Sequence, residues 1–240
     1  MKKVIIGIQA RSGSTRLPNK CLLKVGSHPI LEWVLQSCRS AAAFLNRSDR
    51  LEIKVTPVLL LPANDPLNKL YHSEIDIVSH EDENDVLTRY VKAQEAHGAD
   101  YIVRVTADCL RMKDYIISRA VKQMLKRSRF PTPYEFVTNA IERTAMEGLD
   151  CEVMTAEMLK WLDENAVTAF HREHVTVMIR EMYLDHTFPF KICHLLDDDD
   201  YSDVKTSIDT QEEYDAAVAN MGRVFTKKRE INSRGDFYAS

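Results

Sequence analysis

The chain has 240 residues, of which 45% are hydrophobic and 28% are charged, and its net charge is −4. This composition excludes a collagen-like or low-complexity chain, and the charge gives no overall reason to expect binding to nucleic acid or membranes. No apolar run approaches the roughly 18 residues of a membrane span, and the short apolar run after Lys3 is not a signal sequence. The five cysteines are widely spaced without a Cys-x-x-Cys pair, so a reducing, cytoplasmic location is expected.

Short apolar runs alternate with segments of helical period, which predicts an α/β fold with a mostly parallel sheet and flanking helices. The predicted strands lie at 3–9, 53–61, 75–79, 101–105, 135–138, 151–154 and 188–195. The predicted helices lie at 30–43, 64–71, 86–97, 113–126, 156–164 and 172–183, and a last helix begins after Thr210. Asp85 and Gly98 fit the two ends of the third helix. Pro57 suggests that its strand has an edge position or an irregular start.

No internal repeat or linker-like stretch divides the chain, so one domain is expected over 1–225, followed by a polar tail at 226–240. The predicted strand at 101–105 is the clearest central strand and leads directly to Asp108. Open α/β sheets bind ligands at the carboxyl ends of their strands. The polar loop at 10–20, which follows the first strand, therefore becomes a neighbour of Asp108 if the two strands are adjacent.

The segment 9–20 concentrates three cations, three hydroxyls and a glycine after the first strand. A di- or triphosphate needs this mixture, because backbone N–H groups and hydroxyls solvate its oxygens and Arg or Lys offsets its charge. The loop is neither a Walker A loop nor a Gly-x-Gly-x-x-Gly motif. The residues alone leave an ordinary charged surface loop as an equal alternative.

The run Ile-Gln-Ala-Arg-Ser-Gly-Ser-Thr-Arg-Leu-Pro-Asn-Lys at 8–20 resembles the opening signature of cytidylyltransferases that activate acidic sugars, specifically the spore coat polysaccharide biosynthesis protein F branch. That family is similar to the CMP-Kdo and CMP-N-acetylneuraminate synthetases. Further matches follow in the family's order at 85–90, 103–109, 143–153, 172–180 and 207–214. The resemblance spans residue 3 to about 220 and implies a Rossmann-like fold of the nucleotide-diphospho-sugar transferase type.

The resemblance implies a Mg²⁺-dependent enzyme that transfers CMP from CTP to a sugar, often a 3-deoxy-ulosonic acid, and releases pyrophosphate during surface polysaccharide biosynthesis. Catalysis of such an in-line displacement is mainly positioning and charge stabilisation. CTP and a sugar acceptor are then the small-molecule partners. The resemblance also implies a homodimer, with an acceptor and dimer subregion at about 135–195.

The family signature also assigns roles to residues of this chain. Arg11 and Lys20 would act on the triphosphate as catalytic residues, and Asp108 and Asp209 would hold Mg²⁺. The implied nucleotide-binding set is Gln9, Ala10, Arg11, Ser12, Gly13, Ser14, Arg16, Lys20, Asp85, Arg89 and Thr106. The implied acceptor-binding set is Asn139, Arg143, Asp150, Glu152, His174 and Arg180.

Plainer alternatives remain for several of these residues. Asp108 and Asp209 could each cap the helix that follows them, and 172–180 could carry a structural ion-pair network on one helix. A His-x-x-His spacing at His171 and His174 is weak support for zinc without a third ligand. The Asp-x-Asp pattern in 197–200 would suit the metal site of a nucleotide-sugar glycosyltransferase, although a run of like charges is usually a solvated loop.

The chain also departs from the family pattern beside the proposed metal site. Ala107 replaces a usual glycine, and Leu-Arg-Met at 110–112 replaces Pro-Leu-Ile. Ala-Met-Glu at 145–147 replaces Tyr-Pro-Asp, and Lys205 stands where the family tends to have Arg. These departures predict altered acceptor specificity more than altered nucleotide binding, and they keep a non-catalytic nucleotide-binding relative as an alternative.

Overall fold

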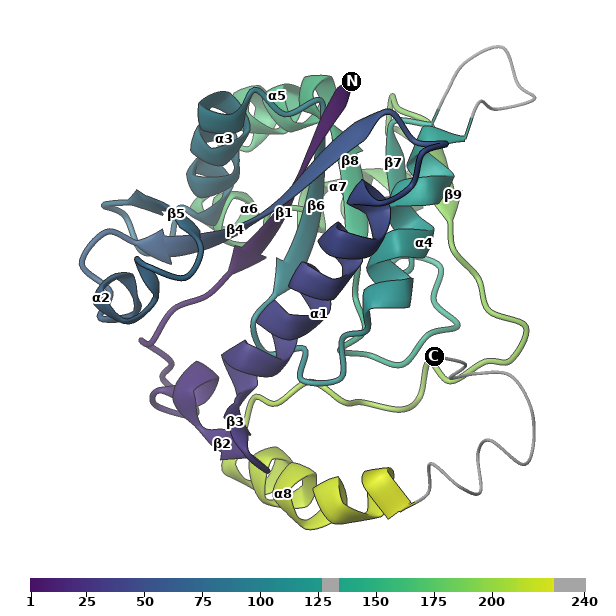
Figure 1. Ribbon diagram of the computed structural model, residues 1–240. Helices are drawn as coiled ribbons and strands as arrows, with labels where there is room; N and C mark the ends of the chain where they lie inside the picture. The colour runs from purple at the N-terminus through teal and green to yellow at the C-terminus, as the bar shows by residue number, and fades with distance from the viewer. Residues whose placement is uncertain (127–133, 227–240) are drawn as a thin grey trace.

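The computed structural model describes residues 1–126 and 134–226, with the backbone alone for 221–226 (Figure 1). A seven-stranded sheet has the strand order β5-β4-β1-β6-β8-β7-β9. Its strands are β1 (Lys2–Gln9), β4 (Ile53–Pro62), β5 (Asp76–His80), β6 (Tyr101–Thr106), β7 (Phe136–Thr138), β8 (Glu152–Thr155) and β9 (Ile192–His194). β8 is antiparallel to β6 and β7, and the other neighbouring pairs are parallel. The predicted, mostly parallel sheet is therefore confirmed.

Helices cover both faces of this sheet (Figure 1). They are α1 (Ile30–Asn46), α2 (Leu67–Tyr71), α3 (Val86–His97), α4 (Asp114–Leu125), α5 (Ala156–Asn165), α6 (Ala169–His174), α7 (Val177–Leu184) and α8 (Gln211–Thr226). Side chains alternate across a strand, so Val4, Ile6 and Ile8 of β1 pack with α1 and α4, whereas Ile5 packs with α3 and α5. Two apolar cores thus enclose the sheet, which is the predicted Rossmann-like α/β arrangement.

A short hairpin and a 3-10 helix follow the first loop, and the sequence analysis did not predict them. They are η1 (Lys20–Leu22), β2 (Lys24–Val25) and β3 (His28–Pro29). α8 lies beside this hairpin (Figure 1), and the Tyr214 hydroxyl donates to the Lys24 carbonyl at 2.8 Å. α8 is thereby held close to the segment that follows β1.

The helix ends follow from local hydrogen bonds. Asp85 accepts from the Thr88 amide at 3.0 Å and caps α3, which ends at Gly98 with a φ of 57°. Thr210 and Glu213 form a reciprocal capping box at α8, because each side chain accepts from the other residue's amide. The N-cap of α4 is Lys113. The capping alternatives for Asp108 and Asp209 are therefore wrong.

The prediction of one continuous helix at 172–183 is also wrong, because the helix is interrupted between α6 and α7. Val175 has a φ of 49° and a fully buried side chain that packs in the core with α3 and α5. A β-branched residue adopts this conformation only where its surroundings enforce it. Burial of Val175, together with a hydrogen bond from Thr176 to Glu152 at 3.0 Å, supplies that constraint. An ion-pair network on a single helix is therefore excluded, since Arg180 lies on α7.

Two smaller differences concern strand edges. β4 is an interior strand, but β5 pairs with it only from Val58 onward, so Pro57 lies where β4 has one partner. The predicted strand at 188–195 is confined to β9, since Phe188 and Phe190 pack on Trp161 of α5 instead. Most of the predicted polar tail, 227–240, lies outside the described residues. In the described part of the chain, no helix has the length and apolar character needed to span a membrane.

Candidate active site

A cavity of about 340 Å³ opens at the carboxyl ends of β1 and β6. The two strands are adjacent, with Gln9 opposite Thr106, so the loop after β1 and the loop after β6 meet as predicted. The lining residues are Gln9, Ala10, Arg11, Ser14, Thr15, Arg16, Lys20, Cys21, Val86, Arg89, Thr106, Ala107, Asp108, Glu173, His174 and Asp209. Most of the residues implied for nucleotide and metal binding therefore share one cavity.

One end of this cavity is a cluster of cations and carboxylates. The Lys20 ammonium donates to Asp108 Oδ2 at 2.8 Å and to Asp209 Oδ1 at 3.0 Å, and Arg16 Nη2 lies 3.2 Å from the same Asp209 oxygen. Burial alone would lower the pKa of Lys20, but the two carboxylates outweigh it and the pKa is raised. Burial alone would raise the pKa of Asp209, but Lys20, Lys205 and Arg16 lower it. These contacts therefore favour the charged forms of Lys20 and Asp209.

This carboxylate pair fits a divalent cation. One ammonium already lies within 3.0 Å of an oxygen from each carboxylate, so Asp108 and Asp209 converge on a single cationic position. Mg²⁺ takes oxygen ligands and commonly uses one or two carboxylates together with phosphate oxygens and water. Among the described residues, no third carboxylate, imidazole or thiolate joins the pair to form a larger metal-binding cluster.

The first loop is held in place by residues that do not line the cavity. The backbone amide and hydroxyl of Ser12 donate to Asp65 Oδ2 at 2.7 and 3.0 Å. Gly13 passes so close to Glu83 that a Cβ would lie 2.7 Å from Glu83 Oε1. Ser12 and Gly13 therefore shape the loop. Asp65 lies in the predicted helix at 64–71, and the sequence analysis did not assign it to the site.

Arg11 and Arg89 form the opposite end of the cavity. Arg11 lies 3.5 Å from Glu83 and 3.3 Å from Glu173, a residue of α6 that the sequence analysis did not assign to the site. Arg89 is 1% exposed, and its Nε has no hydrogen-bond partner. Burial, and then the nearby Arg11, lower the pKa of Arg89. Its Nη2 donates to the backbone carbonyl of Glu83, and the nearby Glu83 and Asp85 charges partly offset the effect of burial on the pKa of Arg89.

Asp85 lies outside the cavity. Its carboxylate caps α3 and accepts from Arg172 Nε at 2.9 Å. Arg172 Nη2 also donates to Asp163 at 2.8 Å, so the group ties α6 to α3 and α5. Burial would raise the pKa of Asp85, but the bonds from Arg172 and Thr88 lower it. The structure thus gives Asp85 a scaffold position beside the site.

Three of the implied acceptor residues, Asn139, Arg143 and Asp150, make protein contacts outside the cavity. Arg143 makes a two-pronged contact with Asp150, at 2.5 and 3.2 Å. Asn139 is buried and bonds the Leu149 carbonyl and the Cys151 amide, each at 2.8 Å. None of these three implied residues lines the cavity.

Glu152, Arg180 and His174 complete the implied acceptor set. Glu152 is 4% exposed and accepts from Arg104 at 2.7 Å, so it forms a buried ion pair across β6 and β8. Arg180 is exposed on α7 away from the cavity, and His174 lies on the cavity wall. His174 is thus the implied acceptor residue that faces the nucleotide side directly.

The departures from the family pattern are absorbed by packing. Met112 is 1% exposed, and Leu110 packs on a small apolar cluster that contains Leu17 and Ile208. Ala107 is buried at the cavity wall. Leu110 is therefore accommodated in this apolar cluster.

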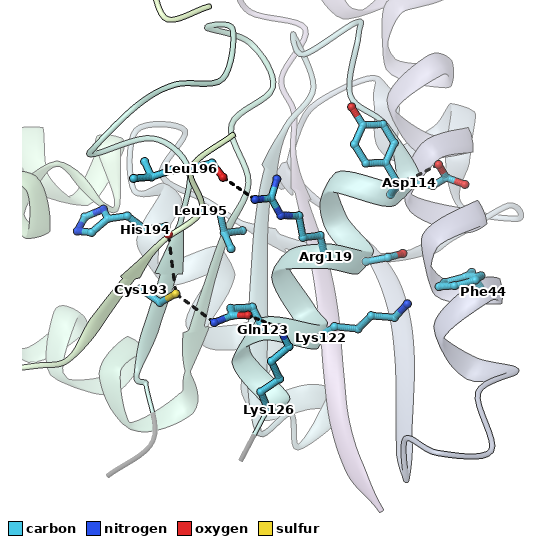
Figure 2. Close-up of a pocket in the computed structure, with 12 residues that line it drawn as sticks. Phe44, Asp114, Arg119, Lys122, Gln123, Lys126, Cys193, His194, Leu195 and Leu196 are labelled. Carbon is cyan, nitrogen blue, oxygen red and sulfur yellow. Dashed lines mark hydrogen bonds between the residues drawn. The ribbon is translucent and has the colours of Figure 1, made fainter. Parts of the chain in front are cut away.

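A larger cavity, of about 740 Å³, lies between α4 and the β9 edge of the sheet (Figure 2). Its polar groups are engaged locally: Arg119 donates to the Leu196 carbonyl at 2.7 Å, and Lys122 lies 4.3 Å from the centre of the Phe44 ring. Arg119 also pairs with Asp197, the first residue of the acidic run. This cavity contains none of the implied site residues, so the smaller cavity is the candidate active site.

The sequence of this chain is similar to one family model and to two known proteins. The Cytidylyltransferase family model matches residues 4–47, which contain most of β1, the loop after it and α1. The uncharacterized protein MJ1063 of Methanocaldococcus jannaschii is 32% identical over 179 residues, covering 75% of this chain and 68% of that protein. The spore coat polysaccharide biosynthesis protein SpsF of Bacillus subtilis is 27% identical over 224 residues, covering 91% and 86%.

Two solved structures are also similar to this chain. A cytidylyltransferase from Leptospira borgpetersenii matches with a TM-score of 0.74 and 28% identity over 100% of both chains. CMP:2-keto-3-deoxy-manno-octonic acid synthetase complexed with CTP matches in fold, with a TM-score of 0.60 and 13% identity over 92% of this chain and 99% of that one. The strand-end cavity, the sequence relatives and the shared fold together show that this chain is a nucleotidyltransferase of the cytidylyltransferase family.

Proposed function

We propose that the chain transfers CMP from CTP to the hydroxyl of an acidic sugar of the 3-deoxy-ulosonic type, with release of pyrophosphate and with Mg²⁺ as cofactor. The observation that carries this proposal is the cavity that Arg11, Arg16 and Lys20 line, in which Arg16 and Lys20 pair with Asp209 and Lys20 also pairs with Asp108. Membership of the cytidylyltransferase family supports CTP as the donor. Similarity to SpsF supports a place in surface polysaccharide biosynthesis.

The reaction is an in-line displacement at the α-phosphorus, so the chain's task is to position the reactants and to offset charge on the departing pyrophosphate. Arg16 and Lys20 are held by carboxylates, and they turn to phosphate oxygens once those carboxylates have another cation to neutralise. Arg11 contacts the triphosphate from the other side of the loop. Removing one such contact costs about 2–4 kcal/mol of transition-state stabilisation.

Asp108 and Asp209 would hold the Mg²⁺ ion. When bound, the ion supplies charge neutralisation for the phosphates and a fixed orientation of their oxygens. The two carboxylates come from the loop after β6 and from the segment before α8, so their separation depends on how closely α8 is held to the sheet. Tyr214 and the hairpin contact provide that attachment.

On the acceptor side, His174 orients the sugar hydroxyl at the cavity wall, and Arg143 binds the sugar carboxylate. The contact between Arg143 and Asp150 has the two-pronged geometry that a sugar carboxylate would use. The Asp150 carboxylate therefore binds Arg143 until the sugar carboxylate replaces it.

We also propose a homodimer in the cytoplasm. All five cysteines are free thiols, as a reducing compartment requires. Light scattering at micromolar concentration checks the assembly: a mass of twice the chain is expected, and a monomer would contradict the proposal.

The activity is tested by incubating the purified chain with each nucleoside triphosphate, Mg²⁺ and a panel of 3-deoxy-ulosonic acids and neutral sugars, and by measuring pyrophosphate. Release that requires both CTP and an acidic sugar is expected. Pyrophosphate release with a different triphosphate would overturn the choice of donor. If CTP binds but no sugar in the panel gives pyrophosphate release, the chain would be a non-catalytic relative. Transfer of sugar from a nucleotide-sugar donor would indicate a glycosyltransferase instead.

A further inference from the structure

Lys205 stands outside the cavity, yet its ammonium joins three carboxylates. Its Nζ lies 2.8 Å from Glu213 Oε1, 3.1 Å from Asp209 Oδ2 and 3.9 Å from Glu147 Oε1. These acids belong to α8, to the segment before α8 and to the loop that the resemblance assigns to the acceptor side. Lys205 therefore connects the proposed metal site to the proposed acceptor loop through its ion pairs.

The two oxygens of Asp209 are divided between different cations. Oδ1 faces Lys20 at 3.0 Å and Arg16 at 3.2 Å, both of which line the cavity. Oδ2 faces Lys205, which does not line it. A carboxylate turns about its terminal torsion with little resistance, so a cation fixed on Oδ2 sets the direction in which Oδ1 points.

The backbone around Lys205 is fastened to the acceptor loop as well. The Glu147 amide donates to the Val204 carbonyl at 2.9 Å, and the Thr206 amide donates to the Glu147 carbonyl at 2.7 Å. Gly148 has a φ of 94°, and a Cβ there would lie 2.4 Å from the Ser207 nitrogen. The two segments therefore touch so closely that neither moves without the other.

We infer that Lys205 is a positioning residue that orients Asp209 toward the divalent cation and couples that orientation to the acceptor loop at Glu147. Lys205 touches no reacting atom; it acts through Asp209. Residues that hold a metal ligand from outside commonly change metal affinity or activity by 10- to 100-fold when they are removed. This inference rests on the proposed Mg²⁺ site, because it concerns the orientation of one of its ligands.

The test compares Lys205→Met and Lys205→Arg with the wild-type chain. Binding of Mn²⁺ in the presence of CTP, measured by electron paramagnetic resonance without acceptor, is a readout separate from turnover. We expect Lys205→Met to weaken Mn²⁺ binding about tenfold and to lower kcat by a similar factor. The KM for CTP at saturating Mg²⁺ stays within about threefold, and Lys205→Arg restores both quantities.

Lys160→Met is the matched control, because Lys160 is an exposed lysine of α5 whose ion pair with Glu164 is 3.9 Å long. It should leave Mn²⁺ binding and kcat unchanged. A folded Lys205→Met chain with wild-type Mn²⁺ affinity would overturn the inference, as would Lys205→Arg behaving like Lys205→Met. Failure of the proposed function gives a distinguishable result, because neither CTP binding nor turnover of the wild-type chain would then depend on a divalent cation.

A second variant tests the coupling to the acceptor loop. Glu147→Gln removes the carboxylate but keeps the backbone bonds of Glu147. We expect the acceptor KM and the Mn²⁺ affinity to change together, each by about two- to fivefold, because the 3.9 Å contact is the weakest of the three. A change in neither quantity would remove Glu147 from the proposal.

Discussion

The two sides of the candidate active site are built differently. On the nucleotide side, Arg16, Lys20, Asp108 and Asp209 reach across the cavity from separate segments and meet one another there. Of the residues implied for acceptor binding, Arg143 and Asp150 pair within one loop and do not line the cavity. A sequence motif thus contains residues that line the cavity as well as residues that stabilise a loop. The structure is needed to tell the two kinds apart.

The largest effect is expected at the carboxylate pair. Asp108→Asn removes one proposed Mg²⁺ ligand and one partner of Lys20, so kcat/KM for CTP should fall roughly 10³-fold. Pyrophosphate release measures this change. Asp76→Asn, at an exposed carboxylate of β5, is the control and should leave the rate unchanged. Activity of Asp108→Asn within tenfold of the wild type would move the catalytic centre elsewhere.

Glu152 tests the opposite side of the comparison. Glu152→Ala leaves Arg104 buried without its counter-ion, which should reduce the free energy of unfolding by about 3 kcal/mol. Urea denaturation measures the loss. Unchanged stability with a raised acceptor KM would instead make Glu152 a substrate-binding residue, as the family resemblance implies.

Arg143 sharpens the comparison within the acceptor loop. Arg143→Lys keeps the charge but loses the two-pronged geometry, so the acceptor KM should rise about tenfold, equivalent to roughly 1.4 kcal/mol. The KM for CTP should stay constant, because Arg143 does not line the nucleotide cavity. Parallel changes in both constants would show that the two sides are not separable.

The smallest effect is expected at Asp85 and depends on pH. Its lowered pKa means that the folded chain favours the ionised carboxylate. Its contribution is therefore present above the usual aspartate pKa, about 3.9, and is lost as the pH falls through the lowered folded-state value. Asp85→Asn removes the charge that pairs with Arg172, so stability should fall by about 1 kcal/mol at pH 7, and the difference should shrink as the pH falls below the usual aspartate pKa. A difference that is independent of pH would contradict this account.

The sequence predicted most of the strands and helices, because hydrophobic period, caps and turn residues are local signals. The loop after β1 and Asp108 could be placed together because both follow strands of one parallel sheet. The break at Val175 could not be predicted, since it depends on burial against distant elements. Asp65 and Glu173 were missed as parts of the site for the same reason: their partners, Ser12 and Arg11, lie far along the chain.

The central claim is that Asp108 and Asp209 make CTP binding depend on a divalent cation. Isothermal titration of CTP, with and without Mg²⁺, tests it in the wild-type chain and in the Asp108→Asn, Asp209→Asn double variant. We expect Mg²⁺ to tighten binding by at least about tenfold in the wild type, equivalent to roughly 1.4 kcal/mol, and to have no effect in the double variant. Equal tightening in both proteins would contradict the claim.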